Sequence, residues 1–345
     1  MTKSKKKLVI TTLNYSLLSK FRVFISKYWQ KNHIFSKKNK VINFYYYSKI
    51  KRKFNFLVAI LDNKLIGVQG FIPLKFFDKN IGHNDIFLAF WRVIKTDLIG
   101  IGYLLHKKIL SYTNPNFIGV IGINSELIDF HKWRGFTVKE MIHYVFVSPY
   151  KKNFKILQYK KNKKIIETKK SNIKISLVDN INKFKKIKKS IFKYQTPVKS
   201  KNYLLNRYLK NDFYKYQIFL IEFKKTNQSI VVTRKINIKN TSVIKIVDYI
   251  GSNSNMSQIN SFLKFLIKIN NSEFIDIYSY GIPEKNLQAA GFIKVNKQNN
   301  IVVPNHFEPF EKKNVTINCA YKCVNKKNNV RIFRGDGDGD RPSKV

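Results

Sequence analysis

The stretch of sequence that decides the fold runs from Asp85 to Phe136 and reads DIFLAFWRVIKTDLIGIGYLLHKKILSYTNPNFIGVIGINSELIDFHKWRGF. Residues 86–93 form an apolar run typical of a buried strand. A loop with Gly100 and Gly102 follows, and then a segment with apolar residues at helical spacing. Residues 117–123 are strand-like again, and a short helix after them is closed by a Gly-Phe pair. This pattern predicts strand, glycine loop, helix and strand, with free N–H groups at the helix N-terminus suited to a pyrophosphate.

Length and composition set the class of protein. The chain has 345 residues, which is room for two ordinary domains, and its 44% hydrophobic and 14% aromatic content is that of a globular protein. No apolar run reaches the roughly 18 residues of a spanning helix, and the basic N-terminus lacks a signal-peptide pattern. Cys319 and Cys323 are too few for a disulfide framework and have no matching histidines for zinc. We therefore expect a cytoplasmic protein without a metal.

The net charge of +46 comes from 66 basic and 20 acidic residues. One interpretation is phosphate neutralisation in a nucleic-acid-binding protein. The other is compositional, because nearly all basic residues are lysines and they are spread along the whole chain, whereas nucleic-acid readers favour arginine. We favour the second interpretation and do not expect a nucleic-acid partner. Attraction to anionic substrates or peripheral contact with an anionic membrane surface stays open.

Outside this stretch the first half reads as one domain over residues 1–150. Residues 8–14 are strand-like, and residues 16–31 have a helical apolar rhythm. Residues 56–77 predict a hairpin that turns at 62–64, and residues 141–150 predict a closing strand.

Residues 151–171 are Lys-rich and predict a linker. The second domain, predicted over 172–330, repeats the order of the first but has GSNSNM where the first has DLIGIG. Residues 331–345 contain GDGDGD and predict a mobile acidic tail. A cation site there is the alternative, although the terminal Glu of an EF-hand loop is missing.

Four segments resemble the GNAT superfamily of acyl-CoA-dependent N-acyltransferases: LDNKLIGVQGFI, DIFLAFWRV, DLIGIG and IGINSELIDFHKWRGF. The pairing of two such domains is similar to the architecture of Fem-type aminoacyltransferases. Short motifs such as NHIF and VVPNHFEPF also resemble acyltransferase-like proteins found with bacterial surface-polysaccharide genes. The resemblance implies an α/β (α+β) protein of two GNAT-like domains in tandem, each a twisted mixed sheet flanked by helices.

The resemblance also implies acetyl-CoA or another acyl-CoA as co-substrate. The family's pyrophosphate loop has the form Gln/Arg-x-x-Gly-x-Gly/Ala, and here Asp97 takes the first position, so Lys95 is expected to supply positive charge. A tight turn at a helix start, without a ligand, is the alternative. The implied cofactor-binding residues are Val93, Lys95, Leu98, Ile99, Gly100, Ile101, Gly102, Tyr103 and Asn124.

The same resemblance suggests catalytic residues. The family commonly places a Tyr, the acid for the leaving thiolate, four residues before the Gly of Gly-Phe, and His131 stands there. Tyr103 and Tyr144 are the fallback donors. Candidates for the base are Asp85, His83 and His33. The strand near Phe90 and Trp91 is expected to offer backbone groups to the acyl carbonyl.

In the second half, His306 and Glu308 lie between two prolines that fix the backbone, and they either line an acceptor pocket or form a surface turn. We predict acyl transfer from acyl-CoA to an amine, most plausibly an amino sugar, nucleotide- or lipid-linked, in surface-polysaccharide (LPS or capsule) biosynthesis. The rival hypothesis is a non-catalytic tandem GNAT-like module that binds a polyanion, nucleic acid or anionic lipid.

Overall fold

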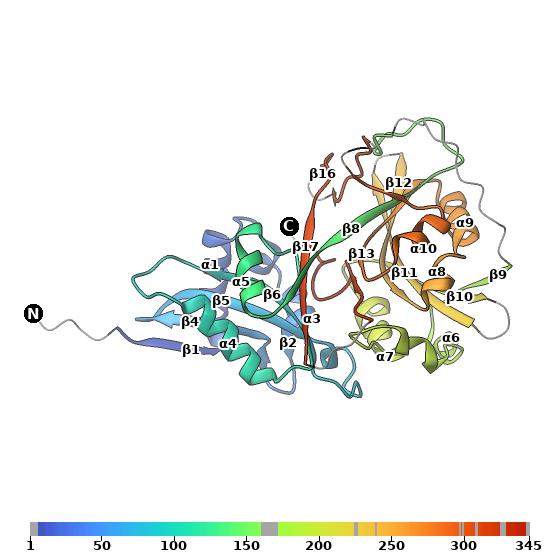
Figure 1. Cartoon of the computed structure of the whole chain (residues 1–345). Coiled ribbons are helices and arrows are strands. Elements are labelled where there is room, and N and C mark those ends of the chain that lie inside the picture. Colours follow the sequence, from blue (N-terminus) through green and yellow to red (C-terminus); the bar gives the residue numbers. More distant parts are fainter. Residues whose placement is uncertain are drawn as a thin grey trace, which may run out of the picture. The chain divides into compact units, whose positions relative to one another are not determined.

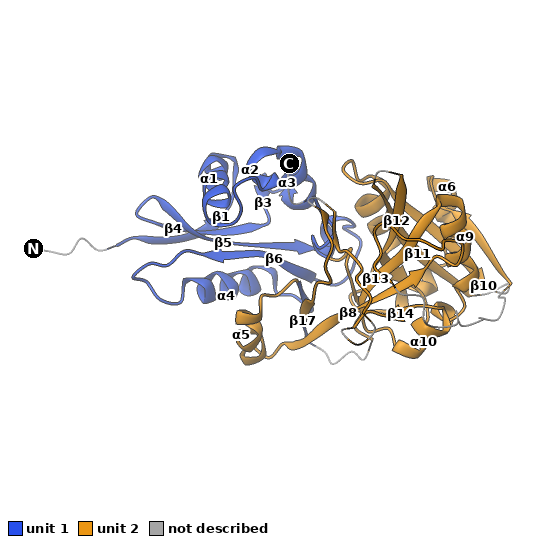
Figure 2. Ribbon diagram, turned by 90° about the horizontal axis from the view of Figure 1, so that it is seen from above, with its two compact units in different colours: residues 1–121, 321–325, 337–345 blue, residues 122–320, 326–336 orange. Residues whose placement is uncertain are grey.

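The computed structural model describes residues 6–159, 172–223, 227–238, 240–296, 298, 300–307, 310–324 and 329–342 (Figure 1). Two compact units divide the chain (Figure 2). Unit 1 is Met1–Ile121, Tyr321–Asn325 and Gly337–Val345, and unit 2 is Gly122–Ala320 and Lys326–Asp336. The first division falls after residue 121 and not after the predicted 150. Residues 160–171 of the predicted linker lie outside the described residues.

Unit 1 contains four α-helices and strands of two to ten residues among its described residues. Its helices are α1 (Leu18–Tyr28), α2 (Ile34–Lys37), α3 (Asn39–Tyr46) and α4 (Ile101–Thr113). Its strands are β1 (Leu8–Thr12), β2 (Tyr47–Ser48), β3 (Lys53–Phe54), β4 (Phe56–Leu61), β5 (Lys64–Pro73), β6 (Asp85–Val93), β7 (Phe117–Ile121) and the last three residues of β17 (Ile317–Cys323).

The main sheet of unit 1 has the order β1-β4-β5-β6-β7. The first three pairings are antiparallel, and β6 and β7 are parallel, as a strand–helix–strand crossover requires. The predicted hairpin is confirmed, with Asp62 and Asn63 at positive φ in its turn. Helices α1 to α3 lie on one face of this sheet and α4 on the other (Figure 2).

Unit 2 has the larger number of elements. Its helices are α5 (Ile128–Trp133), α6 (Ile181–Lys185), α7 (Lys201–Leu204), α8 (Asn253–Met256), α9 (Asn260–Asn270) and α10 (Glu284–Ala289). Its strands are β8 (Thr137–Val147), β9 (Ile173–Leu177), β10 (Tyr216–Phe223), β11 (Asn227–Ile238), β12 (Thr241–Ile250), β13 (Ser272–Tyr280), β14 (Ile293–Lys294), β15 (His306–Phe307), β16 (Phe310–Glu311), the first part of β17 and β18 (Ile332–Phe333).

The main sheet of unit 2 has the order β8-β13-β12-β11-β10-β9. Only β12 and β13 are parallel among these pairs. The antiparallel pairing of β8 with β13 explains why residues 122–150 belong to unit 2 and not to the first domain, where the sequence placed them. A large apolar core that includes α9 covers one face of the sheet, and a smaller core around Val145, Val243 and Phe274 covers the other.

Both units contain the order antiparallel strands, helix, parallel strand. The two Gly-Phe pairs, which both lie in unit 2, correspond to each other in structure. Gly135 and Gly291 both have positive φ and end the short helices α5 and α10. The following Phe136 and Phe292 are buried, and their N–H groups donate to the carbonyls of His131 and Leu287. This is one helix-ending motif used twice, in which the residue after the glycine packs against the last helical turn.

Residues 331–342, the described part of the predicted acidic tail, are packed and not mobile. In unit 2, Asp336 is fully buried and pairs with Lys199 at 2.7 Å. In unit 1, Asp338 accepts from the Tyr46 hydroxyl at 2.7 Å and from Arg341 at 2.6 Å. The aspartates thus have basic and phenolic partners, and no group of three metal-ligating side chains occurs among the described residues. The helices of the described ranges also include none long and apolar enough to cross a membrane.

Candidate functional site

Strand β6 is paired with β7 only over its first four residues. Their register runs from Asp85 opposite Phe117 to Leu88 opposite Val120. Strand β6 continues to Val93 and stays bonded to β5 on its other edge. Among the described residues, the edge of β6 over residues 89–93 therefore extends beyond its pairing with β7. An extended ligand with amide groups can bond to such a strand edge.

A β-bulge lies at the point where the two strands part. The register between β5 and β6 shifts between Val68 and Gly70, which face Arg92 and Ala89. The intervening Phe90 has φ +52°, a left-handed conformation that a non-glycine residue adopts rarely. A bulged residue is left out of the ladder, so its backbone groups are available to another partner.

An aromatic cluster holds the bulge in this conformation. The Phe90 ring stacks on Trp29 with a centroid distance of 4.4 Å and contacts Phe35 at 5.0 Å. The ring of His33 meets Phe90 edge-on at 4.9 Å, and the Arg341 guanidinium lies 4.8 Å from the same ring. Phe90 is only 6% exposed. The surrounding packing therefore fixes the strained residue, as is usual at functional sites.

The glycine loop joins the end of β6 to α4. Gly100 is the N-cap of the helix and has φ +82°, which favours glycine. A Cβ on Gly102 would lie 3.2 Å from the Trp91 ring, tighter than an ordinary van der Waals contact, so a side chain there requires the ring to shift. Ile101 is buried and anchors the first turn. The 13-residue helix has no side-chain cap bond and no acidic residue in its first turn, so its N-terminus suits an anion.

Asp97, the unusual residue of the loop, is paired with a cation. Its carboxylate accepts a hydrogen bond from Lys6, and this bond lowers the pKa of Asp97. Both side chains are largely solvent-exposed, at 83% for Asp97 and 48% for Lys6. Lys95, two residues earlier, is exposed as well. The ion pair offsets the repulsion that a lone carboxylate would exert on a phosphate.

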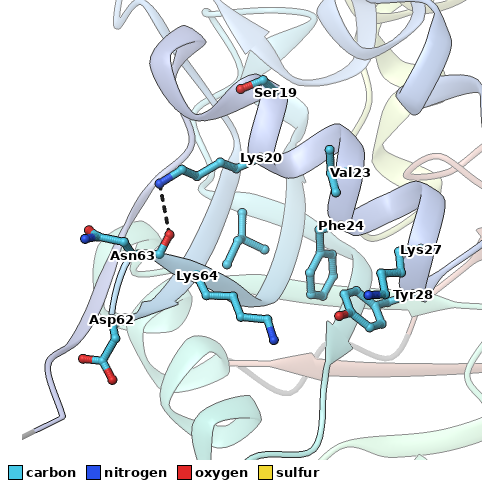
Figure 3. A pocket seen from close by; sticks show the side chains of 10 residues that line it. Ser19, Lys20, Val23, Phe24, Lys27, Tyr28, Asp62, Asn63 and Lys64 are labelled. Atoms are coloured by element: carbon cyan, nitrogen blue, oxygen red, sulfur yellow. Dashed lines mark hydrogen bonds between the residues drawn. The ribbon is translucent and has the colours of Figure 1, made fainter.

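A groove of about 530 Å³ lies on the opposite side of unit 1, between α1 and the β4–β5 turn (Figure 3). Val23, Phe24, Tyr28 and Leu65 form its apolar lining, and the other residues around it are Ser19, Lys20, Lys27, Asp62, Asn63 and Lys64. Lys20 donates to the carbonyl of Asn63 across one end. None of the residues predicted from the sequence lines this groove.

Solved structures share this arrangement of strands and helices. A GCN5-related N-acetyltransferase from Anabaena variabilis matches over 92% of this chain and 73% of its own, with a TM-score of 0.55 and 11% identity. The fold is that of the GCN5-related N-acetyltransferases. An Enterococcus faecalis protein described as a probable N-acyltransferase matches over 93% of this chain and 73% of its own, with a TM-score of 0.55 and 8% identity. A GCN5-related N-acetyltransferase from Kribbella flavida matches over 92% of this chain and 71% of its own, with a TM-score of 0.52 and 8% identity. No protein-family model and no curated protein matches the sequence.

The predicted cofactor-binding residues come together in unit 1 with one exception. Val93, Lys95 and residues 98–103 form one continuous segment from the end of β6 to the first turn of α4. Asn124 lies in unit 2, where it precedes a short 3-10 helix at Ser125–Leu127 and donates to Glu126.

Two of the predicted base residues lie away from this segment. Asp85 is the first residue of β6 and is 3% exposed. Val93 lies eight positions further along the strand, a distance of roughly 26 Å at about 3.3 Å per strand residue. His83 is an exposed residue of the loop just before it. The glycine loop and these two side chains are therefore at opposite ends of β6.

His33 contacts the bulge but is held in a structural role. It caps α2, because its Nδ1 accepts from the Phe35 N–H at 3.2 Å. Burial, and then the nearby Arg341 cation, lower the pKa of His33 to about 3. The imidazole is thus neutral at pH 7 and packs between Phe35 and Phe90.

His131, the predicted thiolate acid, is 2% exposed in unit 2. Its ring contacts Phe136 edge-on at 5.1 Å, and its counterpart in the second helix-ending motif is the buried Leu287. Burial lowers the pKa of His131 to about 4. These observations describe a packing residue. Of the fallback donors, Tyr144 is buried in unit 2, and Tyr103 is half-buried in the first turn of α4.

His306 of the proposed acceptor pocket is exposed and lies in the β15–β16 hairpin of unit 2, opposite Glu311. Partial burial, followed by Arg334, lowers the pKa of His306. Glu308 lies outside the described residues.

A buried charge cluster in unit 2 was missed by the sequence reasoning. Asp276 accepts from Lys245 at 2.8 Å and lies 2.9 Å from Nε2 of His143, and all three side chains are at most 6% exposed. Burial opposes ionisation of Asp276, but Lys245 and His143 outweigh it and bring its pKa to about 2. Burial lowers the pKa of Lys245 to about 8. Charged residues within the apolar runs of β12 and β13 were the available signal.

Proposed function

We propose that this chain is an acyl-CoA-dependent N-acyltransferase that binds its acyl-CoA in unit 1. The observation that carries the proposal is the bulged β6, which parts from β7 and leads through a left-handed Gly100 into α4. That combination offers an anion site and a strand edge beyond the β7 pairing, a few residues apart. The GNAT fold of the solved structures supports the same placement.

The residues present fit an acyl-CoA. The first N–H groups of α4 would receive the pyrophosphate, and Gly102, whose Cα lies close to the Trp91 ring, presents no side chain there. The edge of β6 over residues 89–93 would bond to the two amides of the pantetheine arm. The bulge at Phe90 would donate a backbone N–H to the thioester carbonyl, where negative charge develops.

The acyl-CoA supplies an activated acyl group, whose C–S bond breaks as a C–N bond to the acceptor amine forms. The acceptor amine loses a proton in this step, and the sulfur leaves as a thiolate that takes one up, so the protons balance. We assign this proton exchange to solvent, because Tyr103, the fallback donor in unit 1, lies in the same helical turn as Gly102, at the pyrophosphate end of the slot and away from the thioester.

The acceptor we propose is an amine, and more narrowly an amino sugar, nucleotide- or lipid-linked, in surface-polysaccharide assembly. Support for the narrower class comes from the sequence resemblance alone. It is tested by measuring thiol release from acetyl-CoA with a nucleotide-linked amino sugar and with the matching sugar that carries a hydroxyl in place of the amine. Thiol release with both sugars, or with neither, would remove this acceptor class.

Calorimetric titration with acetyl-CoA tests the binding step. We expect Gly102→Val to weaken binding at least tenfold, because its side chain would collide with Trp91 at the helix N-terminus. Gly82→Ala is the matched control, since nothing lies within 4 Å of a Cβ at that exposed loop position and we expect unchanged affinity. A wild-type chain that is folded by circular dichroism and releases no heat with acetyl-CoA would refute the proposal.

A further inference from the structure

Strands β12 and β13 of unit 2 part in the same way as β6 and β7 of unit 1. Their parallel register ends with Ile246 opposite Ile277. The register between β11 and β12 shifts at this point, so that Val247 is the extra residue of a bulge. Unit 2 therefore has its own bulged strand and its own strand edge beyond the parallel pairing.

In unit 2 a strand from the C-terminal segment takes this edge. Ser279 of β13 faces Ile142 of β8 on one side and Phe333 of β18 on the other, and Tyr280 faces Ile332. Strand β18 thus continues along the edge that β12 occupies up to Ile277. On the side of β12, the Gly335 N–H donates to the carbonyl of the bulged Val247 at 2.7 Å.

Buried side chains anchor this segment. Phe333 is fully buried in the main core of unit 2, and its N–H donates to Asp336 at 2.8 Å. Lys199 bridges Asp336 and Asp248, each at 2.7 Å, with all three side chains inaccessible to solvent. A buried ion pair holds its partners in one geometry because removing either leaves an uncompensated charge. The segment is therefore an integral strand of unit 2.

The loop after β12 corresponds to the glycine loop of unit 1, and it is occupied by a side chain of the C-terminal segment. Arg331 donates to the Gly251 carbonyl and, at 2.8 Å, to Oδ1 of Asn253. The short helix α8 and the N-cap Ile259 precede α9, so no glycine opens its first turn. An arginine from the C-terminal segment thus occupies the position that corresponds to the glycine loop of unit 1.

We infer that residues 330–336 fill, in unit 2, the slot that corresponds to the proposed acyl-CoA slot of unit 1. The chain then binds one acyl-CoA, in unit 1, and unit 2 holds an internal strand in place of a ligand. This inference rests on the proposed function for its ligand. The occupation of the slot by the chain itself rests on the pairing and burial described above.

The test combines binding stoichiometry with hydrogen exchange on the full-length chain. We expect one acetyl-CoA per chain in wild type, and in Gly102→Val the same single site with an affinity at least tenfold weaker. The amides of Phe333 and Gly335 should exchange slowly with and without acetyl-CoA, whereas amides in residues 89–93 should become protected when acetyl-CoA is added.

Two sites per chain, a site of wild-type affinity in Gly102→Val, or loss of protection at Phe333 on adding acetyl-CoA would overturn the inference. Absence of binding to a folded wild-type chain would refute the proposed function instead. In that case the exchange of Phe333 and Gly335 still decides whether the segment is a permanent strand, because fast exchange without ligand would contradict it.

Discussion

At the scale of single residues, His131 and Tyr103 test whether the positions suggested by the family pattern carry chemistry. We expect His131→Leu to keep both the fold and kcat within a few-fold, because the equivalent position of the second helix-ending motif, Leu287, is already a buried leucine. We expect Tyr103→Phe to keep kcat within a few-fold as well, because Tyr103 lies at the pyrophosphate end of the proposed slot, a pantetheine arm away from the thioester. Steady-state rates of thiol release check both variants. A large loss in His131→Leu, with the fold intact, would restore His131 as the acid.

Lys245 gives a prediction for stability against pH. Its pKa is about 8 in the folded chain and 10.5 in the reference state, and it faces Asp276, Arg334 and Arg234. Between these two pH values the unfolded chain holds a proton that the folded chain has lost, so stability rises with pH. The shift corresponds to on the order of 3 kcal/mol. Urea unfolding of wild type and Lys245→Met from pH 7 to 10 should show this rise only in wild type, and parallel curves would contradict it.

At the scale of secondary-structure elements, much of the fold was predictable because strands and helices follow local apolar spacing. The hairpin at Asp62-Asn63, the glycine loop and α4 all lie where the sequence placed them. The C-terminal segment did not, since a run of Gly and Asp has no local reason to be buried. Its partners Lys199 and Tyr46 lie more than a hundred residues away in the chain. The bulge at Phe90 was not predictable either, because packing from α1, α2 and Arg341 imposes it.

The buried C-terminal segment leads to a prediction about stability. Asp336→Asn removes one of the two carboxylates that share Lys199, in a site without solvent. Asp248 still neutralises Lys199 in this variant, so we expect the loss of one buried charge-assisted hydrogen bond, about 1.5–3 kcal/mol. Asp338→Asn is the matched control, since that side chain is partly exposed, and we expect a smaller loss. Urea unfolding measures both, and equal losses would mean that the Lys199 pair does not stabilise the segment.

At the scale of the whole molecule, the net charge of +46 makes salt a useful variable. Salt screens the repulsion among lysines in the compact state, so we expect the urea midpoint to rise between 0.05 and 0.5 M NaCl, roughly the range over which the Debye length falls from above 10 Å to below 5 Å. Binding of acetyl-CoA should weaken over the same range, because its phosphates are attracted by the same charge. A urea midpoint that falls with salt would show that surface ion pairs outweigh the repulsion.

The same measurements separate the transferase from a polyanion-binding module. Any chain this basic is expected to bind anionic vesicles or single-stranded nucleic acid weakly, with an affinity that falls steeply with salt. Such binding spreads over many lysines and should be equal in wild type and Gly102→Val. Acetyl-CoA binding depends on the absence of a side chain at Gly102 in the first turn of α4 and should be weakened at least tenfold in that variant. If Gly102→Val instead reduces polyanion binding and leaves acetyl-CoA binding unchanged, the glycine loop is a polyanion site and the transferase hypothesis fails.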